Sequence, residues 1–281
     1  MGLVGLPDAV GVVWAAAMLT NIYTGMVLFF GMASEVSLSV AQVTVLGSMI
    51  LVAHSLPVEG AVAKAAGVPW AATLALRLGG GLALGLLLHL AYSLSGTLQE
   101  PAQLLWQPTL VPDVGWLAWA LAQLRMLGLI LVVIASLMLL LKLLRAIGVE
   151  RWIHALLAPV LRLIGIGREA GNITVIGFTL GLSFGAGLLI REARSGVLGR
   201  RDLFLTMSFL GLCHSVIEDT LLILLLGADL SGILWARIAF ALAVIAVLAR
   251  LLPPEKPPCA ARAIETEPAT DRATNPAAGR D

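Results

Sequence analysis

Seven long apolar stretches determine what this chain can fold into. Each is close to or above the roughly 20 residues that a helix needs to cross a bilayer. Charged residues make up 12% of the chain and hydrophobic residues 59%, whereas soluble domains are about 25% charged. The sequence therefore predicts an all-α polytopic membrane protein with about six to seven membrane helices in a lipid bilayer. The stretches are 8–33, 41–66, 68–92, 116–146, 172–192, 203–226 and 229–252.

The net charge and the cysteines exclude several classes of function. The formal net charge is +1, so the chain lacks the basic surface that a nucleic-acid-binding protein needs. Cys213 lies in an apolar stretch and Cys259 in a polar tail, a separation that suggests neither a disulfide nor a set of metal ligands. Cys213 adjoins His214, but one thiol beside one imidazole does not define a metal site. The sequence predicts no metal and no cofactor.

The distribution of basic residues predicts the orientation of the chain. The connection 95–115 contains two acidic residues but no Lys or Arg, whereas 142–168 contains five basic residues. The positive-inside rule then puts 95–115 outside the cell and 142–168 in the cytoplasm. Residues 151–165 have the spacing expected of a helix that lies at the interface. Residues 253–281 have too little apolar area for a core, which predicts a disordered cytoplasmic tail.

Two halves of the chain are related by an internal repeat. Shifted by 160 positions, AHSLPVEG at 53–60 aligns with CHSVIEDT at 213–220 without a gap. Such self-similarity indicates a duplication, with a first repeat at 1–94 and a second at 169–252. The intervening 95–168 would hold the outer loop, a linking span and the interfacial helix. The matched pairs include Gly25 with Gly185, Ser48 with Ser208, His54 with His214, Ser55 with Ser215, Glu59 with Asp219, Gly67 with Gly227, and Arg77 with Arg237.

The charges favour repeats of opposite orientation. The linker 34–40 of the first repeat is predicted outside, while its counterpart at 191–202 carries four arginines and belongs in the cytoplasm. The stretch 172–192 must then enter and leave on the cytoplasmic side as a re-entrant hairpin, and its glycines permit such a turn. The same glycines recur every four residues, which suits a straight, closely packed helix equally well. A straight span would make the repeats parallel.

Polar side chains occupy matching places deep in the two halves. A carboxylate in hydrocarbon costs several kcal/mol, so it needs a partner, a cavity or a substrate. Discontinuous helices at matching places of two repeats are typical of transporter sites, and Pro57 interrupts the first such helix. The candidate site residues are His54, Ser55, Glu59 and Arg77 of the first half, and Asn172, His214, Ser215, Glu218, Asp219 and Arg237 of the second.

The acids and bases of this set can be paired. Glu59 is a partner for Arg77, and Asp219 or Glu218 is a partner for Arg237. One carboxylate is left over, which we identify as Glu218, and it would meet a cation, a proton or a substrate donor. The alternative is that these residues are structural ion pairs that lock adjacent helices together.

The stretch 8–33 is interpreted differently from its counterpart in the second half. Asn21, Tyr23 and Thr24 lie at the positions that match the predicted hairpin. Because 8–33 looks like one ordinary span, we expect these three residues to be structural.

The segment GREAGNITVIGFTLGLSFGAGLLIREARSG, followed by a helix broken at CHSVIEDT, resembles the nucleoside recognition, or Gate, domain family of bacterial membrane proteins. That family includes ferrous-iron transporter B, spore maturation proteins A and B, and the concentrative nucleoside transporters. The resemblance covers roughly 20–250 and is clearest over 165–250. It implies an inner-membrane protein whose inverted repeats meet around a polar midplane site, and which forms a homo-oligomer or assembles with a partner membrane subunit.

Two functions fit these features. The first is a secondary transporter or permease that moves a small solute, nucleoside-like or ionic, through the midplane site with a coupling proton or cation. The second is a non-transporting assembly subunit, as the resemblance to spore maturation proteins implies, with structural ion pairs. An enzyme is not predicted, because His214, Ser215 and Asp219 lie on one helix and no nucleophile elbow accompanies them.

Overall fold

The computed structural model describes residues 1–32, 35–104, 115–195 and 198–253. This part of the chain is helical and contains no strands, as the sequence predicts. The first half contains η1 (Gly2–Val4), η2 (Asp8–Val10), α1 (Gly11–Leu19), α2 (Ile22–Met32), α3 (Val40–Ala53), α4 (Leu56–Ala65), α5 (Trp70–Leu74), η3 (Ala75–Gly79) and α6 (Gly80–Ser95). The remainder contains α7 (Trp116–Ala146), α8 (Val149–Leu163), α9 (Arg168–Leu180), α10 (Leu182–Ser195), α11 (Arg200–Leu212), α12 (Val216–Leu224), η4 (Ser231–Ala236) and α13 (Arg237–Leu251).

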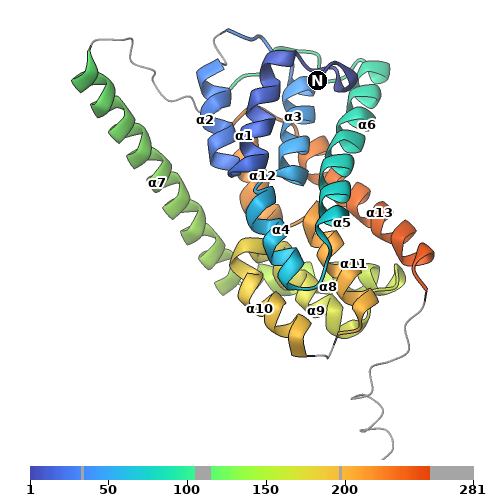
Figure 1. The fold of residues 1–281 in the computed structure, drawn as a ribbon. Helices are drawn as coiled ribbons and strands as arrows, with labels where there is room; N and C mark the ends of the chain where they lie inside the picture. The colour runs from blue at the N-terminus through green and yellow to red at the C-terminus, as the bar shows by residue number, and fades with distance from the viewer. Residues whose placement is uncertain (33–34, 105–114, 196–197, 254–281) are drawn as a thin grey trace, which may run out of the picture.

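Five helical segments in the described residues are long and apolar enough to cross a membrane. Two of them, Val40–Ala65 and Arg200–Leu224, form the centre of the molecule, since 83% of the most apolar stretch of each is buried. Two more segments flank them, Trp70–Ser95 and Ser231–Leu251. In each of these, 33% of the most apolar stretch is buried. The fifth, Trp116–Leu144, has no buried residue in that stretch and leans away from the bundle (Figure 1). The chain is therefore a multi-pass membrane protein.

The elements repeat in the same order in both halves. The shift of 160 positions carries α1 and α2 onto α9 and α10, and α3 and α4 onto α11 and α12. A π-helical turn also precedes the last long helix of each half, η3 before α6 and η4 before α13. In Figure 1, α1 and α2 lie at one end of the molecule, while α9 and α10 lie at the other. This arrangement is that of inverted repeats.

The stretch 172–192 is a hairpin rather than a straight span. Helix α9 ends at Leu180, α10 begins at Leu182, and the two helices contact each other. Gly181 joins them at φ 86° and ψ 162°, a conformation that is essentially restricted to glycine. A side chain there would also meet the hydroxyl of Ser215. Gly181 thus supplies both the turn and the close approach to the second repeat's broken helix.

Replacing Gly181 with alanine should destabilise the protein by at least about 1–3 kcal/mol, because the backbone conformation becomes strained and the new methyl group meets Ser215. Thermal unfolding of the purified protein in detergent would measure the change. The control is Gly171→Ala in the same helix, where an added methyl group meets no neighbour within 4 Å. An unfolding temperature for Gly181→Ala equal to that of the control would contradict the hairpin geometry.

The prediction that 8–33 is one ordinary span is wrong. The chain forms two short helices, α1 and α2, which contact each other. The turn between them depends on polar side chains: the Thr20 hydroxyl donates to the Ala16 carbonyl at 2.6 Å, and the Asn21 side chain accepts from the Thr24 amide at 3.0 Å. The Asn21 bond satisfies an amide that the start of a helix leaves free, and the Thr20 hydroxyl adds a second bond to the Ala16 carbonyl, which already accepts from the Thr20 amide.

Candidate functional site

Both central helices are broken at equivalent places. Helix α3 ends before His54 and α4 begins after Ser55, while α11 ends before Cys213 and α12 begins after Ser215. The two serines share a left-handed backbone, with φ 50° for Ser55 and φ 44° for Ser215. Such values are uncommon for residues other than glycine. Because Pro57 has no counterpart in the second repeat, proline alone does not account for the breaks.

One arginine satisfies the free carbonyls at each break. Arg77 donates through Nε to the Val52 carbonyl at 2.9 Å and through Nη2 to the His54 carbonyl at 2.8 Å. Arg237 forms the corresponding bonds, to Leu212 at 3.2 Å and to His214 at 2.9 Å. A cation at a helix C-terminus also complements the negative end of the helix dipole. The two arginines, each 1% exposed, therefore stabilise the broken helices.

The carboxylates beside these arginines differ between the halves. Glu59 forms a hydrogen-bonded ion pair with Nη1 of Arg77, as the sequence predicts. Asp219 is one methylene shorter, and its Oδ2 lies 3.9 Å from Nη2 of Arg237. Among the described residues, Oδ2 of Asp219 and Nη1 of Arg237 are buried without a hydrogen-bond partner. The repeat is thus asymmetric at this pair.

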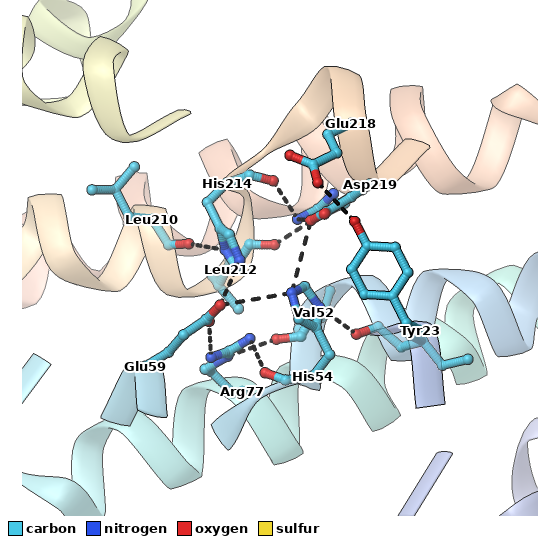
Figure 2. A network of polar contacts seen from close by, with 12 residues as sticks. Tyr23, Val52, His54, Glu59, Arg77, Leu210, Leu212, His214, Glu218 and Asp219 are labelled. Atoms are coloured by element: carbon cyan, nitrogen blue, oxygen red, sulfur yellow. Dashed lines mark hydrogen bonds and ion pairs between the residues drawn. The ribbon is translucent and has the colours of Figure 1, made fainter. Parts of the chain in front are cut away.

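The carboxylate expected to lack a protein partner has one. The Tyr23 hydroxyl donates to Oε1 of Glu218 at 3.0 Å, as Figure 2 shows. Tyr23 comes from α2, so this bond joins the first repeat's hairpin to the second repeat's helix α12. The expectation that Tyr23 is merely part of an ordinary span is therefore also corrected. Among the described residues, the acid with a fully buried oxygen that lacks a hydrogen-bond partner is Asp219.

The two histidines meet between the breaks, with ring centroids 5.1 Å apart. Nδ1 of His54 lies 3.1 Å from the Ile50 carbonyl, and Nδ1 of His214 lies 2.7 Å from the Leu210 carbonyl. A carbonyl oxygen can only accept, so each Nδ1 carries the hydrogen. In the neutral imidazole, Nε2 then holds a lone pair.

Each Nε2 faces a carboxylate from the opposite repeat. His214 Nε2 lies 3.1 Å from Glu59 Oε1, and His54 Nε2 lies 3.8 Å from Asp219 Oδ2. His54 Nε2 is also 3.7 Å from Glu59 Oε1. All four residues are 5% exposed or less. Figure 2 shows these side chains converging from both halves.

The other predicted site residues lie around this centre. The backbone amide of Ser55 donates to the Ala17 carbonyl at 2.9 Å, and Ser215 approaches Gly181, so each serine packs on its own repeat's hairpin. Asn172 belongs to α9, but its side chain lies outside the described residues. A cavity of about 10 Å³ adjoins Glu59 and Arg77.

Comparison with known proteins supports the membrane assignment. No family model matches the chain, and no solved structure matches it. It is 31% identical over 267 residues to a protein of Bacillus subtilis, strain 168, described as "Uncharacterized membrane protein YvoD". The match covers 92% of this chain and 82% of the relative. The chain therefore belongs to the family of the membrane protein YvoD.

Proposed function

We propose that this protein is a secondary transporter, and that a small solute or ion passes through the buried centre between its two repeats. The observation that carries the proposal is the meeting of four buried electron-pair donors, two from each half, at the breaks of two central helices: Nε2 of His54 and His214, and carboxylate oxygens of Glu59 and Asp219. Discontinuous helices in matching places are a feature of transporters with inverted repeats, where one repeat rocks against the other.

The polar atoms at the centre distinguish transport from a purely structural role. A structural set of ion pairs should satisfy every buried charge, because an unpaired one costs several kcal/mol. The arginines donate to the carbonyls at the breaks, which favours a structural role for them. By contrast, Oδ2 of Asp219 and Nη1 of Arg237 have no hydrogen-bond partner among the described residues, and each histidine Nε2 faces a carboxylate. An assembly subunit accounts for the arginines but not for this centre.

The family resemblance adds to the proposal. Hairpins followed by broken helices are what the Gate resemblance implies, and on that basis the cargo would be nucleoside-like or an ion. We infer that the end of the molecule with α8, α9 and α10 lies on the cytoplasmic side of the inner membrane, because Arg191, Arg194, Arg200 and Arg201 lie there. No catalytic role is proposed.

Thiol accessibility tests the proposal without knowledge of the cargo. In a Cys213→Ala, Cys259→Ser background, cysteine at position 55 or 215 should react with a membrane-impermeant maleimide added to cells or to inverted vesicles. Alternating access requires that water reaches the breaks from at least one side. The control is Ser48→Cys, on α3 and 0% exposed, which should stay unlabelled. If cysteines at 55 and 215 are as unreactive as that at 48 from both sides, the transport proposal fails.

A further inference from the structure

The geometry at the centre points to a specific chemical class of ligand. Among the described residues, His54, Glu59 and His214 are all buried and present possible ligand atoms within 4.8 Å of one another. Asp219 adds a fourth atom, 3.8 Å from His54 Nε2. We propose that His54, His214, Glu59 and Asp219 bind one divalent transition-metal cation.

The separations fit four ligands around one ion. Metal–ligand bonds of about 2.0–2.2 Å in a tetrahedral site place neighbouring ligand atoms roughly 3.3–3.6 Å apart. Three of the separations at the centre are 3.1, 3.7 and 3.8 Å. Direct hydrogen bonds fit less well, because His54 lies beyond the usual limit of about 3.2 Å from both carboxylates. One ion among His54, His214 and Glu59, whose ligand atoms all lie within 4.8 Å of one another, would satisfy those three together, and Asp219 lies beside it, 3.8 Å from His54 Nε2.

The surroundings of the ligand atoms also match those of a metal site. Ligating histidines usually donate the other ring N–H to a carbonyl or carboxylate, which fixes the ring and its tautomer. Both histidines do so here, through Nδ1 to the carbonyls of Ile50 and Leu210. Arg77 holds Oε2 of Glu59 and leaves Oε1 directed at the histidines. Because the four ligands come from α4, α12 and the two breaks, the ion would join the repeats.

The charge of the centre and the type of its ligands narrow the choice of ion. Glu59, Glu218 and Asp219 against Arg77 and Arg237 leave one negative charge in excess, so a cation is favoured at this buried centre. Two imidazoles with two carboxylates suit Zn²⁺, Fe²⁺ or Mn²⁺, whereas Mg²⁺ and Ca²⁺ prefer oxygen ligands alone. Binding stands independently of transport, while a role of the ion as cargo rests on the proposed function.

Metal binding can be measured on the purified protein. After removal of any affinity tag and of bound metal by chelation, titration with Zn²⁺ in detergent should show one site per chain. His54→Gln and His214→Gln should each weaken it by at least about 100-fold. His89→Gln is the matched control, because His89 lies far along α6 and bonds only Ser93 among the described side chains. It should leave the affinity unchanged.

A second measurement does not depend on the variants folding. Co²⁺ in a four-coordinate site absorbs visible light far more strongly than hydrated Co²⁺, so the wild-type protein should develop visible bands that saturate at one equivalent and disappear on addition of Zn²⁺. The proposal is overturned if Co²⁺ gives no such bands. It is also overturned if Zn²⁺ binding is weak and the affinity falls as much in His89→Gln as in His54→Gln and His214→Gln.

The two proposals fail separately. Labelled cysteines at positions 55 and 215 without a Zn²⁺ site would leave a transporter for another solute. A Zn²⁺ site with unreactive cysteines would instead indicate a metal that holds the two repeats together.

Discussion

Replacing Arg77 with methionine should destabilise the protein by about 3–5 kcal/mol, the usual effect of removing one partner of a buried ion pair. Three groups would lose their donor at once: the carbonyls of Val52 and His54, and the Glu59 carboxylate. Arg237→Met removes two hydrogen bonds, to the carbonyls of Leu212 and His214, and a looser contact with Asp219 at 3.9 Å. The loss of stability should therefore be smaller than that of Arg77→Met by about 1.5–3 kcal/mol. That difference is the contribution of one hydrogen bond to a charged group.

Thermal and denaturant unfolding in detergent, or resistance to proteolysis in membranes, would rank the two variants. Arg191→Met is the control, since that side chain is 75% exposed and should have little effect. Adding Glu59→Gln to Arg77→Met should recover part of the loss, because the buried carboxylate is then neutral. Equal effects of the two replacements would mean that the carbonyl bonds dominate and that the Glu59 pair contributes little.

The duplication could be predicted because its signal lies in residue identities. Histidine, serine, an acid and an arginine at one constant offset are improbable in an apolar chain, and the structure gives His54 and His214 the same Nδ1 bond, four residues back along the helix. The pairing of Glu59 with Arg77 followed from the same positions. Local sequence thus specifies both the broken helices and the charges beside them.

The first hairpin was missed because hydropathy alone does not show a turn. The stretch 8–33 is largely apolar, and its break depends on Thr20 and Asn21. The repeat contained the signal: Asn21 aligns with Gly181, and both residue types favour turns. Tyr23 was then assigned wrongly, since its bond to Glu218 joins residues 195 positions apart. Such a contact depends on how the repeats pack.

The role of the arginines was only partly predictable. Counting charges pairs an arginine with an acid but does not reveal that backbone carbonyls need the same donor. Those carbonyls become available only once α3 and α11 end, at His54 and Cys213. The crosswise contacts of His54 with Asp219 and of His214 with Glu59 likewise require the inverted packing of the two halves.

Asp219→Asn and Glu59→Gln should differ in their effect on stability but have the same effect on function. Asp219 has a buried oxygen with no hydrogen-bond partner among the described residues. An asparagine could donate to the nearby His54 Nε2, 3.8 Å from that oxygen, so we expect unchanged stability or a gain of about 1–3 kcal/mol. Glu59→Gln weakens the bond to Arg77 and should cost about 1.5–3 kcal/mol.

Both variants remove a negative charge from the centre, so both should abolish flux. The measurement is uptake into proteoliposomes, with Zn²⁺ followed by a trapped indicator and labelled nucleosides tested in parallel, beside unfolding in detergent. Stability and activity often oppose each other at functional sites, because a group needed for function can be costly to the fold. If the Asp219 carboxylate had only a structural role, Asp219→Asn would lower the stability of the protein and leave its flux equal to that of the wild type. A stable Asp219→Asn protein without flux would identify this acid as part of the solute path.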